Sequence, residues 1–402
     1  MLSVLDLFCG AGGLSLGLKR AGVVPVLALD HFPAATATYR KNLGDHVVDA
    51  EIHEGIAHPK VDVIVGGPPC QGFSSAGQRK VGDHRNTLVS VFASLIARER
   101  PKAFIFENVE GFLTAESGDR VLDLLQPLVD AGYCIHLRKV NAANFGAPQH
   151  RKRVIGIGGR GFDPGFPEAT HAARGAPGAT LAGRHLPATP SVLDALLGLP
   201  APSRLAPGSP PGHFAAPLDE SDLKRVCALR PGQTMRDLPE NLWHQSYRRR
   251  AFRRVADGTP TENRGGAPAG IRRLIGDEPC KAITSGALTE FIHPEQDRYL
   301  TLRECARLQT FPDDFEFLGT QAEQRTLLGN AIPPVLGEAL GRHIVQALRK
   351  AELDKVGGQV LSFVPTLSMG MSPALQHTQT RVLERFRSAS ASRPMQEGFA
   401  WD

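Results

Sequence analysis

Residues 61–75, VDVIVGGPPCQGFSS, decide how this chain is organised. The first five are largely apolar and β-branched, which is typical of a buried parallel strand. The pairs Gly66-Gly67 and Pro68-Pro69 then stop both strand and helix, because proline lacks an amide donor and glycine lacks stiffness. Cys70 therefore lies on a rigid loop just past the carboxyl end of a strand, where doubly wound α/β folds hold their ligands. A lone cysteine is more often a small core residue, but a core cysteine needs no such stiffened approach.

An alternation of strands and helices runs through about the first 160 residues. Strands are predicted at 2–8, 24–30, 44–52, 61–65, 102–109, 133–140 and 154–159. Helices are predicted at 14–22, 31–43, 87–100 and 118–132. This order predicts an α/β fold, a doubly wound, mostly parallel sheet with helices on both faces.

Polar and glycine residues follow several of these strands. The turn CGAGG after the first strand suggests a nucleotide-type cofactor at a helix N-terminus, although glycines that only make a tight turn are an alternative. It is no dinucleotide fingerprint, because Ser15 occupies the third glycine position. Asp30 ends the second strand, where it either accepts hydrogen bonds from ribose hydroxyls or is simply solvated. Glu107 ends the fifth strand, on the same rim as Cys70.

Composition excludes several classes of protein. A chain of 402 residues has room for two or three domains, and no apolar run reaches membrane-spanning length. The six cysteines form no CxxC pair, so we expect neither a metal site nor a disulfide framework. The expected compartment is the reducing cytoplasm. The stretch from 161 to about 217 is rich in Pro, Gly and Ala and is predicted to be loop-dominated.

Positive charge is concentrated between Tyr247 and Leu274. Eight arginines there face only Asp257 and Glu262, a local charge of +6 in a chain whose net charge is +5. A phosphate backbone is the obvious counterpart, although a short charged run is usually just a solvated face. The arginines are Arg248, Arg249, Arg250, Arg253, Arg254, Arg264, Arg272 and Arg273.

Taken together, these stretches resemble the DNA (cytosine-5) methyltransferase family over roughly residues 3–160 and 279–350. The resemblance rests on DLFCGAGG, GGPPCQGFS, ENV, QHRKR, RYLTLRECARLQTFP and GNAIPP, in that order. Two departures are visible: Asp30 stands where many members carry a glutamate, and Leu327 where a glutamine usually begins the last block.

The resemblance implies a role for each matching residue. Cys70 would add to carbon 6 of cytosine, Glu107 would contact ring nitrogen 3 and the amino group, Arg153 would hold the carbonyl oxygen, and Arg151 would support the catalytic loop. For both arginines, pairing with a phosphate or a carboxylate is the alternative. S-adenosylmethionine would be the cofactor. The residues implied for it are Phe8, Gly10, Gly12, Gly13, Asp30, Asp49, Pro69 and Asn330. Gln71 and Ser74 would join the arginines in contacting DNA, and the loop 74–86 would close over a flipped base.

The expected architecture is a catalytic domain at 1–165, completed by 315–350, around an inserted DNA-recognition domain at 166–314. Residues 351–402 form a tail without an assigned role. The expected partners are duplex DNA and, where one exists, a cognate restriction endonuclease; the chain is expected to act as a monomer, away from membranes. Two rival interpretations are methylation of transfer RNA and a non-catalytic DNA-binding regulator. Intact Cys70, Glu107 and Arg153 weigh against the regulator, and the long arginine-rich insert favours duplex DNA.

Overall fold

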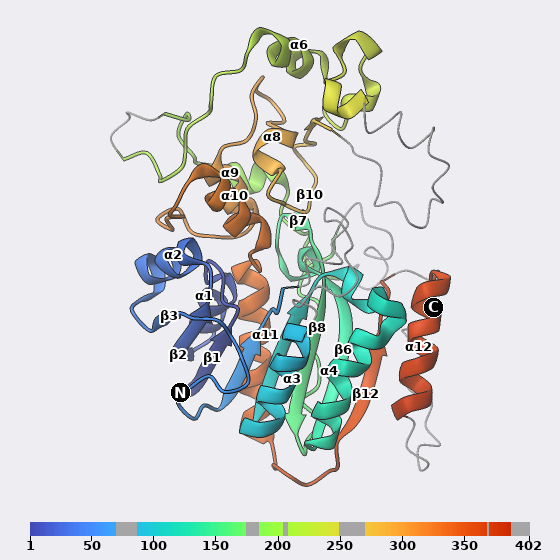
Figure 1. The fold of residues 1–402 in the computed structure, drawn as a ribbon. Coiled ribbons are helices and arrows are strands. Elements are labelled where there is room, and N and C mark those ends of the chain that lie inside the picture. The colour runs from blue at the N-terminus through green and yellow to red at the C-terminus, as the bar shows by residue number, and fades with distance from the viewer. Residues whose placement is uncertain (70–86, 174–184, 204–207, 249–269, 368–369, 387–402) are drawn as a thin grey trace.

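The computed structural model describes residues 1–69, 87–173, 185–203, 208–248, 270–367 and 370–386. Within these residues, no helix is both long and apolar enough to cross a membrane. The molecule consists of an eight-stranded sheet covered on both faces and a smaller part that sits above one end of the sheet (Figure 1).

The sheet follows the predicted alternation. Its strands are β1 (Leu2–Leu7), β2 (Val23–Asp30), β3 (Val47–Asp49), β4 (Val63–Gly66), β5 (Ala103–Asn108), β6 (Tyr133–Asn141), β8 (Lys152–Arg160) and β12 (Gln359–Val364). They lie side by side in the order β12-β6-β8-β5-β4-β1-β2-β3. Every neighbouring pair is parallel except those that β8 makes with β5 and β6.

The antiparallel direction of β8 has a simple cause. A parallel neighbour needs a long crossover, usually a helix, whereas only ten residues separate β6 from β8. Those residues hold the short helix η3 (Ala142–Phe145) and strand β7 (Gln149–His150), so the chain turns straight back.

Two apolar layers sandwich the sheet. One contains α3 (Thr87–Glu99) and α4 (Asp119–Asp130), and the other contains α1 (Gly13–Arg20) and α11 (Pro334–Lys350). Helix α11, which lies within the predicted returning segment 315–350, packs along α1 on this face. Helix α2 (Pro33–Leu43) covers the β2–β3 edge.

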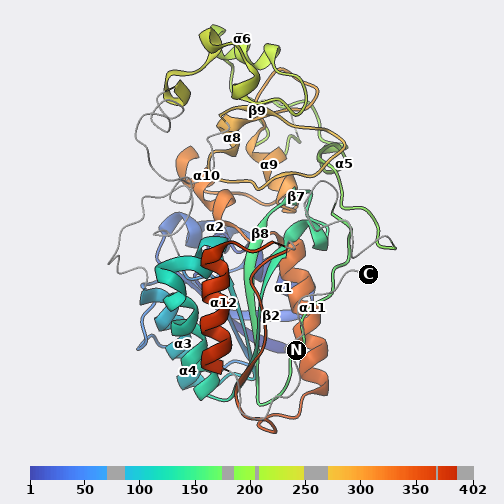
Figure 2. The ribbon, with the colours of Figure 1, turned by 90° about the vertical axis from the view of Figure 1, so that its right-hand side faces the viewer.

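The tail also belongs to the sheet, which its composition did not predict. Strand β12 pairs in parallel with β6, and α12 (Pro373–Phe386) packs beside α4 and the short helix η2 (Glu110–Gly118) (Figures 1 and 2). Strand β12 therefore covers what would otherwise be an unpaired strand edge.

The smaller part contains short elements and two apolar clusters. Its elements are α5 (Val192–Leu196), α6 (Glu220–Ala228), η4 (Met235–Asp237), η5 (Glu240–Leu242), β9 (Arg272–Arg273), β10 (Cys280–Lys281), α8 (Ala287–Glu290), β11 (Phe291–Ile292), α9 (Leu302–Leu308) and α10 (Gln321–Asn330). One cluster, around Val226, Met235 and Tyr247, is its own core. The other joins α9 and α10 to Ala34 and Ala35 of α2, which fixes the smaller part to the sheet.

Candidate active site

The turn after β1 has the backbone of a ligand-binding loop. Phe8, Gly10 and Gly12 all have positive φ, at 60°, 54° and 89°. A Cβ at Gly12 would lie 2.4 Å from the side chain of Leu43, and one at Gly13 would lie 2.2 Å from the carbonyl of Ile332. Packing therefore requires both of these glycines. A Cβ at Gly10 would meet nothing within 4 Å, so the open side of this turn lies at Gly10.

Asp30 holds this turn in place. Its Oδ2 accepts a hydrogen bond from the Gly10 amide (2.8 Å) and its Oδ1 one from the Phe32 amide (2.9 Å). Burial raises the pKa of Asp30, against the lowering effect of these two amides. Each carboxylate oxygen keeps a second lone pair for a ligand hydroxyl.

The other residues expected near the cofactor lie around the same turn. Asp49 ends β3 directly opposite Asp30 in the strand register, and its side chain is exposed. Asn330 ends α10, is exposed, and stands two residues before Ile332, whose carbonyl lies against Gly13. The structure thus brings the turn, Asp30, Asp49 and Asn330 together at the carboxyl ends of the strands β1 to β3.

The segment leading to Cys70 is held by the end of β5. Asn108 Nδ2 donates to the carbonyl of Pro68 (3.1 Å), and a Cβ at Gly67 would come within 2.8 Å of Glu107 Oε2. Pro69 is the last residue of this segment that the structure describes. The stretch 70–86 lies outside the described residues, and it contains Cys70, Gln71, Ser74 and the rest of the loop 74–86. Glycine at 67 and asparagine at 108 both bring this segment close to the carboxylate of Glu107.

Glu107 and Arg153 form a shielded ion pair. Arg153 Nε lies 2.8 Å from Glu107 Oε1, and the two side chains are only 14% and 11% exposed. Burial raises the pKa of Glu107, while Arg153 and Arg151 act to lower it. Arg153 also donates from Nη1 to the carbonyl of Lys152 (2.8 Å). A carboxyl group poised between these influences is suited to exchange a proton.

Arg151 points away from this pair and into the junction with the smaller part. It is fully buried and donates from Nη1 to the carbonyl of Ile283 and from Nη2 to that of Gly329, both at 2.8 Å. These contacts make Arg151 a brace between the two parts of the molecule. Its expected support of the catalytic loop stays a prediction, because that loop lies outside the described residues.

Gln149 is a second brace, a residue of the QHRKR stretch to which the sequence alone assigned no role. Its Nε2 donates to the carbonyl of Leu308 (2.7 Å) and to Gln309 Oε1 (2.8 Å), and its Oε1 accepts from the Ile283 amide (3.0 Å). The position of Gln149 in the same QHRKR stretch was the available signal.

The arginines expected to contact DNA fall into two groups, those outside the described residues and those within them. Arg249, Arg250, Arg253, Arg254 and Arg264 lie outside the described residues. Arg248 is exposed and donates to the carbonyl of Glu240 (2.8 Å). Arg272 is partly buried, which lowers its pKa.

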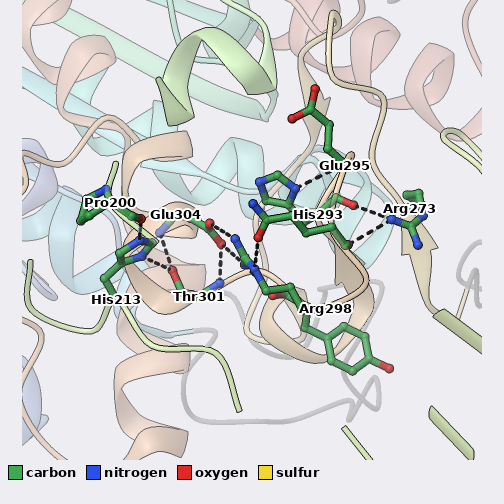
Figure 3. A network of polar contacts seen from close by, with 10 residues as sticks. Pro200, His213, Arg273, His293, Glu295, Arg298, Thr301 and Glu304 are labelled. Atoms are coloured by element: carbon green, nitrogen blue, oxygen red, sulfur yellow. Dashed lines mark hydrogen bonds and ion pairs between the residues drawn. The ribbon is translucent and has the colours of Figure 1, made fainter. Parts of the chain in front are cut away.

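Arg273 is not a surface residue, which corrects its assignment to the DNA-contacting set. It is 5% exposed, and its guanidinium donates to the carbonyls of Leu229 (2.7 Å), Val226 (2.8 Å) and Gln296 (3.0 Å) and pairs with Asp297. Figure 3 shows the hydrogen bond that it donates to the carbonyl of His293 (3.1 Å). With its donors engaged in this way, Arg273 ties α6 to the segment that leads into α9.

The same network anchors α9. Arg298 binds Glu304 through two parallel hydrogen bonds of 2.8 and 2.6 Å, and Thr301 caps the helix by accepting from the Glu304 amide (Figure 3). Glu304 is 2% exposed. Burial acts to raise the pKa of this carboxyl, but the contacts of Glu304 with Arg298 and the Thr301 amide outweigh burial and lower that pKa. The stretch RYLTLRECARLQTFP is therefore structural.

Lys281 is an exposed cation near the QHRKR stretch, and it is not among the DNA contacts expected from the sequence. It pairs in register with His150, and its pKa is lowered first by the nearby charge of Arg272. Arg272, Lys281 and the QHRKR stretch thus place positive charge together where β10 meets β7.

Comparison with known proteins gives consistent relatives. Residues 2–169 and 232–346 match the family model described as C-5 cytosine-specific DNA methylase. The chain is 34% identical to the Type II methyltransferase M1.HphI of Haemophilus parahaemolyticus, covering 86% of this chain and 87% of that protein. It is 30% identical to the Type II methyltransferase M.AgeI of Thalassovita gelatinovora, covering 86% and 100%.

Among solved structures, the fold is similar to that of a protein described as a DNA modification methyltransferase of an Escherichia coli prophage. The TM-score is 0.65 at 24% identity, and the match covers 87% of this chain and 100% of that one. At this identity the likeness concerns the fold.

Proposed function

Because the chain belongs to the C-5 cytosine-specific DNA methylase family, we propose that it transfers a methyl group from S-adenosylmethionine to carbon 5 of a cytosine in a specific duplex DNA sequence. The observation that supports this most directly is the Glu107–Arg153 pair beside the Gly67–Pro68 segment. A carboxyl and a guanidinium there suit a pyrimidine ring, which offers a nitrogen and a carbonyl oxygen.

The residues of the turn after β1 fit the cofactor. A ligand backbone can approach the open side of Gly10, the free lone pairs of Asp30 suit ribose hydroxyls, and exposed Asp49 suits the adenine amino group. Phe8 would stack on the adenine, while Pro69 and Asn330 would border the methionine end. When bound, the cofactor supplies an electrophilic methyl group on a sulfonium.

Cys70 has the role of nucleophile in this proposal. Its thiolate would add to carbon 6 of the cytosine, which makes the electron pair of the 5,6 double bond available at carbon 5. Carbon 5 would then take the methyl group, whose bond to the sulfonium sulfur breaks and leaves that sulfur as a neutral thioether. Loss of the carbon 5 proton then returns the electron pair, and the thiolate leaves. A cytosine inside a duplex cannot reach Cys70, so the base must be flipped out at a cost of about a few kcal/mol.

Glu107 and Arg153 act together on the ring. While Arg153 pairs with Glu107, it stabilises the carboxylate and limits the rise in the pKa of Glu107 that burial causes. An arginine that turns to the cytosine carbonyl stabilises that carboxylate less, so only Arg151 still opposes the effect of burial and the pKa of Glu107 rises further. Base binding would in this way prepare the acid that contacts ring nitrogen 3.

Duplex DNA is the substrate favoured by the relatives, which carry the names of DNA methylases and Type II methyltransferases. Arg272, Lys281 and the arginines of 248–264 would meet the phosphates and base edges, and Gln71 and Ser74 the flipped nucleotide's surroundings. We propose that the chain acts as a monomer and needs no stable complex with an endonuclease.

The test is methyl transfer from labelled cofactor to duplex DNA and, in parallel, to transfer RNA. Duplex containing 5-fluorocytosine should trap wild-type protein in a denaturation-resistant complex, because fluorine cannot leave carbon 5 as the proton does. Cys70→Ala should form no such complex, and Cys280→Ala, which removes a buried thiol elsewhere, should still form it. A trapped Cys70→Ala complex, or transfer to RNA alone, would contradict the proposal.

A further inference from the structure

The tail of the chain is packed into the molecule at two points. Val360 and Phe363 of β12 and Val382 of α12 are buried in the same apolar cluster as α3 and α4. This tail lies beyond residue 346, where the family match ends. The need to cover the edge of β6 accounts for the presence of β12, but it does not account for the presence of α12.

Helix α12 lies against an unusual stretch of backbone. In η2, Glu116 and Ser117 have φ of 46° and 56°, and Gly118 follows at 91°. Two consecutive non-glycine residues in the left-handed region cost about 1–3 kcal/mol each and persist only where their surroundings hold them. The chain kinks here within η2, just before α4 begins.

The polar contacts of α12 converge on this kink. Thr378 is fully buried and donates from Oγ1 to the carbonyl of Leu113 (2.9 Å). Arg381 donates from Nη1 to the carbonyl of Ser117 (2.8 Å) and from Nη2 to Asp119 Oδ1 (2.6 Å). A Cβ at Gly118 would lie 2.8 Å from Thr378 Oγ1, so helix and kink are in close contact.

The kinked segment is in turn attached to the catalytic end of β5. It begins at Glu110, two residues after Asn108, which binds the carbonyl of Pro68. The Phe112 ring packs on that of Phe106 with 5.1 Å between centroids, and Phe106 directly precedes Glu107. A shift of η2 would therefore move the residues that flank Glu107.

We propose that α12 is a positioning element, in which Thr378 and Arg381 hold η2 and, through it, Glu107 and Asn108 in the geometry that methyl transfer requires. This inference rests on the proposed function. Neither Thr378 nor Arg381 touches a reacting group, so both act through the main chain of η2.

The test compares two arginines of the same helix. Arg381→Ala removes the contacts with the kink, whereas Arg385→Ala removes a contact with Gln126 in the middle of α4. Both side chains are at the surface, where an ion pair adds little to stability, so both variants should fold. Thr378→Val keeps the buried shape and loses the hydroxyl.

The readouts are the single-turnover rate of methyl transfer, its pH profile, and the separate dissociation constants for cofactor and duplex. We expect Arg381→Ala and Thr378→Val to lower the rate by roughly tenfold, since a small misplacement of a reacting group is enough for this, and to shift the pH profile, with both dissociation constants unchanged. Arg381→Lys should recover part of the rate, and Arg385→Ala should match wild type. Faster amide hydrogen exchange over residues 107–118 in Arg381→Ala and Thr378→Val, but not in Arg385→Ala, would report the loosened segment directly.

Two results would overturn the proposal: a wild-type rate and pH profile in both Arg381→Ala and Thr378→Val, or equal losses in Arg381→Ala and Arg385→Ala. Either would leave α12 as a helix that only buries apolar surface beside α4 and η2. These outcomes are distinct from failure of the proposed function, in which wild type itself would not methylate duplex DNA.

Discussion

Glu107 is a buried carboxyl whose protonation is contested by its neighbours. Burial raises its pKa, and Arg153 at 2.8 Å opposes that rise. The acid form that we propose acts on the ring is present below the raised pKa and is lost as pH increases through it.

Replacing Glu107 with glutamine should therefore lower the rate of methyl transfer and abolish the dependence of that rate on the protonation of residue 107. We expect Glu107→Gln to bind cofactor normally and to methylate roughly 10² to 10⁴ times more slowly, the usual effect of losing a positioned acid. The wild-type single-turnover rate should fall as pH rises through the Glu107 pKa, and that fall should be absent in Glu107→Gln. Glu99→Gln, at the far end of α3, is the matched control. Wild-type turnover of Glu107→Gln at saturating DNA would remove Glu107 from the mechanism.

Between elements, a buried polar chain joins β1, α1 and α2. Ser15 Oγ donates to Asp6 Oδ2 (2.6 Å), Tyr39 Oη donates to Ser15 Oγ (2.9 Å), and His46 Nε2 lies 3.0 Å from Tyr39 Oη. Asp6 is 1% exposed, and burial raises its pKa to about 7.

This raised pKa makes the stability of the fold depend on pH. In the unfolded chain Asp6 titrates near 4, so between about pH 4 and 7 the folded state holds a proton that the unfolded state lacks. The free energy of unfolding should then decrease as pH rises through this window, by up to about 1.4 kcal/mol per pH unit from this group. Above pH 7 the contribution is constant.

Asp6→Asn keeps an oxygen that can accept from Ser15 and has no proton to lose. Urea unfolding at pH 5, 6, 7 and 8 should show a shallower decline in Asp6→Asn than in wild type. Asp45→Asn, at an exposed side chain, should decline as wild type does. Parallel curves for wild type and Asp6→Asn would mean that Asp6 is ionised throughout.

The molecule as a whole has two different ends. Arg272 and Lys281 lie at the end that carries the smaller part, next to the QHRKR stretch. The turn between α11 and β12, which contains Lys355, lies at the opposite end of the sheet (Figure 1). If DNA binds at the end that carries the smaller part, only the cations at that end should neutralise phosphates and release counterions from the DNA.

Salt titrations of binding can test this division. Arg272→Ala and Lys281→Ala should each weaken binding to duplexes of any sequence and reduce the slope of log affinity against log salt by about 0.9. Lys355→Ala should change neither quantity. Loss of affinity confined to one sequence would instead make Arg272 or Lys281 a reader of base edges.

Local chemistry was enough to locate the ends of the central strands. Gly66 to Pro69 stop β4 within a few residues, and the polar pair Glu107-Asn108 ends β5, so the positions of the site residues follow from short stretches of sequence. The same stretches carried the family resemblance that the comparisons confirm.

Tertiary packing decided what local sequence leaves open. Arg272 and Arg273 are neighbours of the same type in one short strand, and successive side chains of a strand point to opposite sides. Only the carbonyls gathered by α6 and the loop after β11 make Arg273 a buried brace, while Arg272 stays partly exposed. Arg151 and Arg153 differ for a similar reason, because one meets the carbonyls of Ile283 and Gly329 and the other meets Glu107. The partners of these cationic side chains lie between 20 and 178 residues away along the chain, and no pattern within the strand itself specifies them.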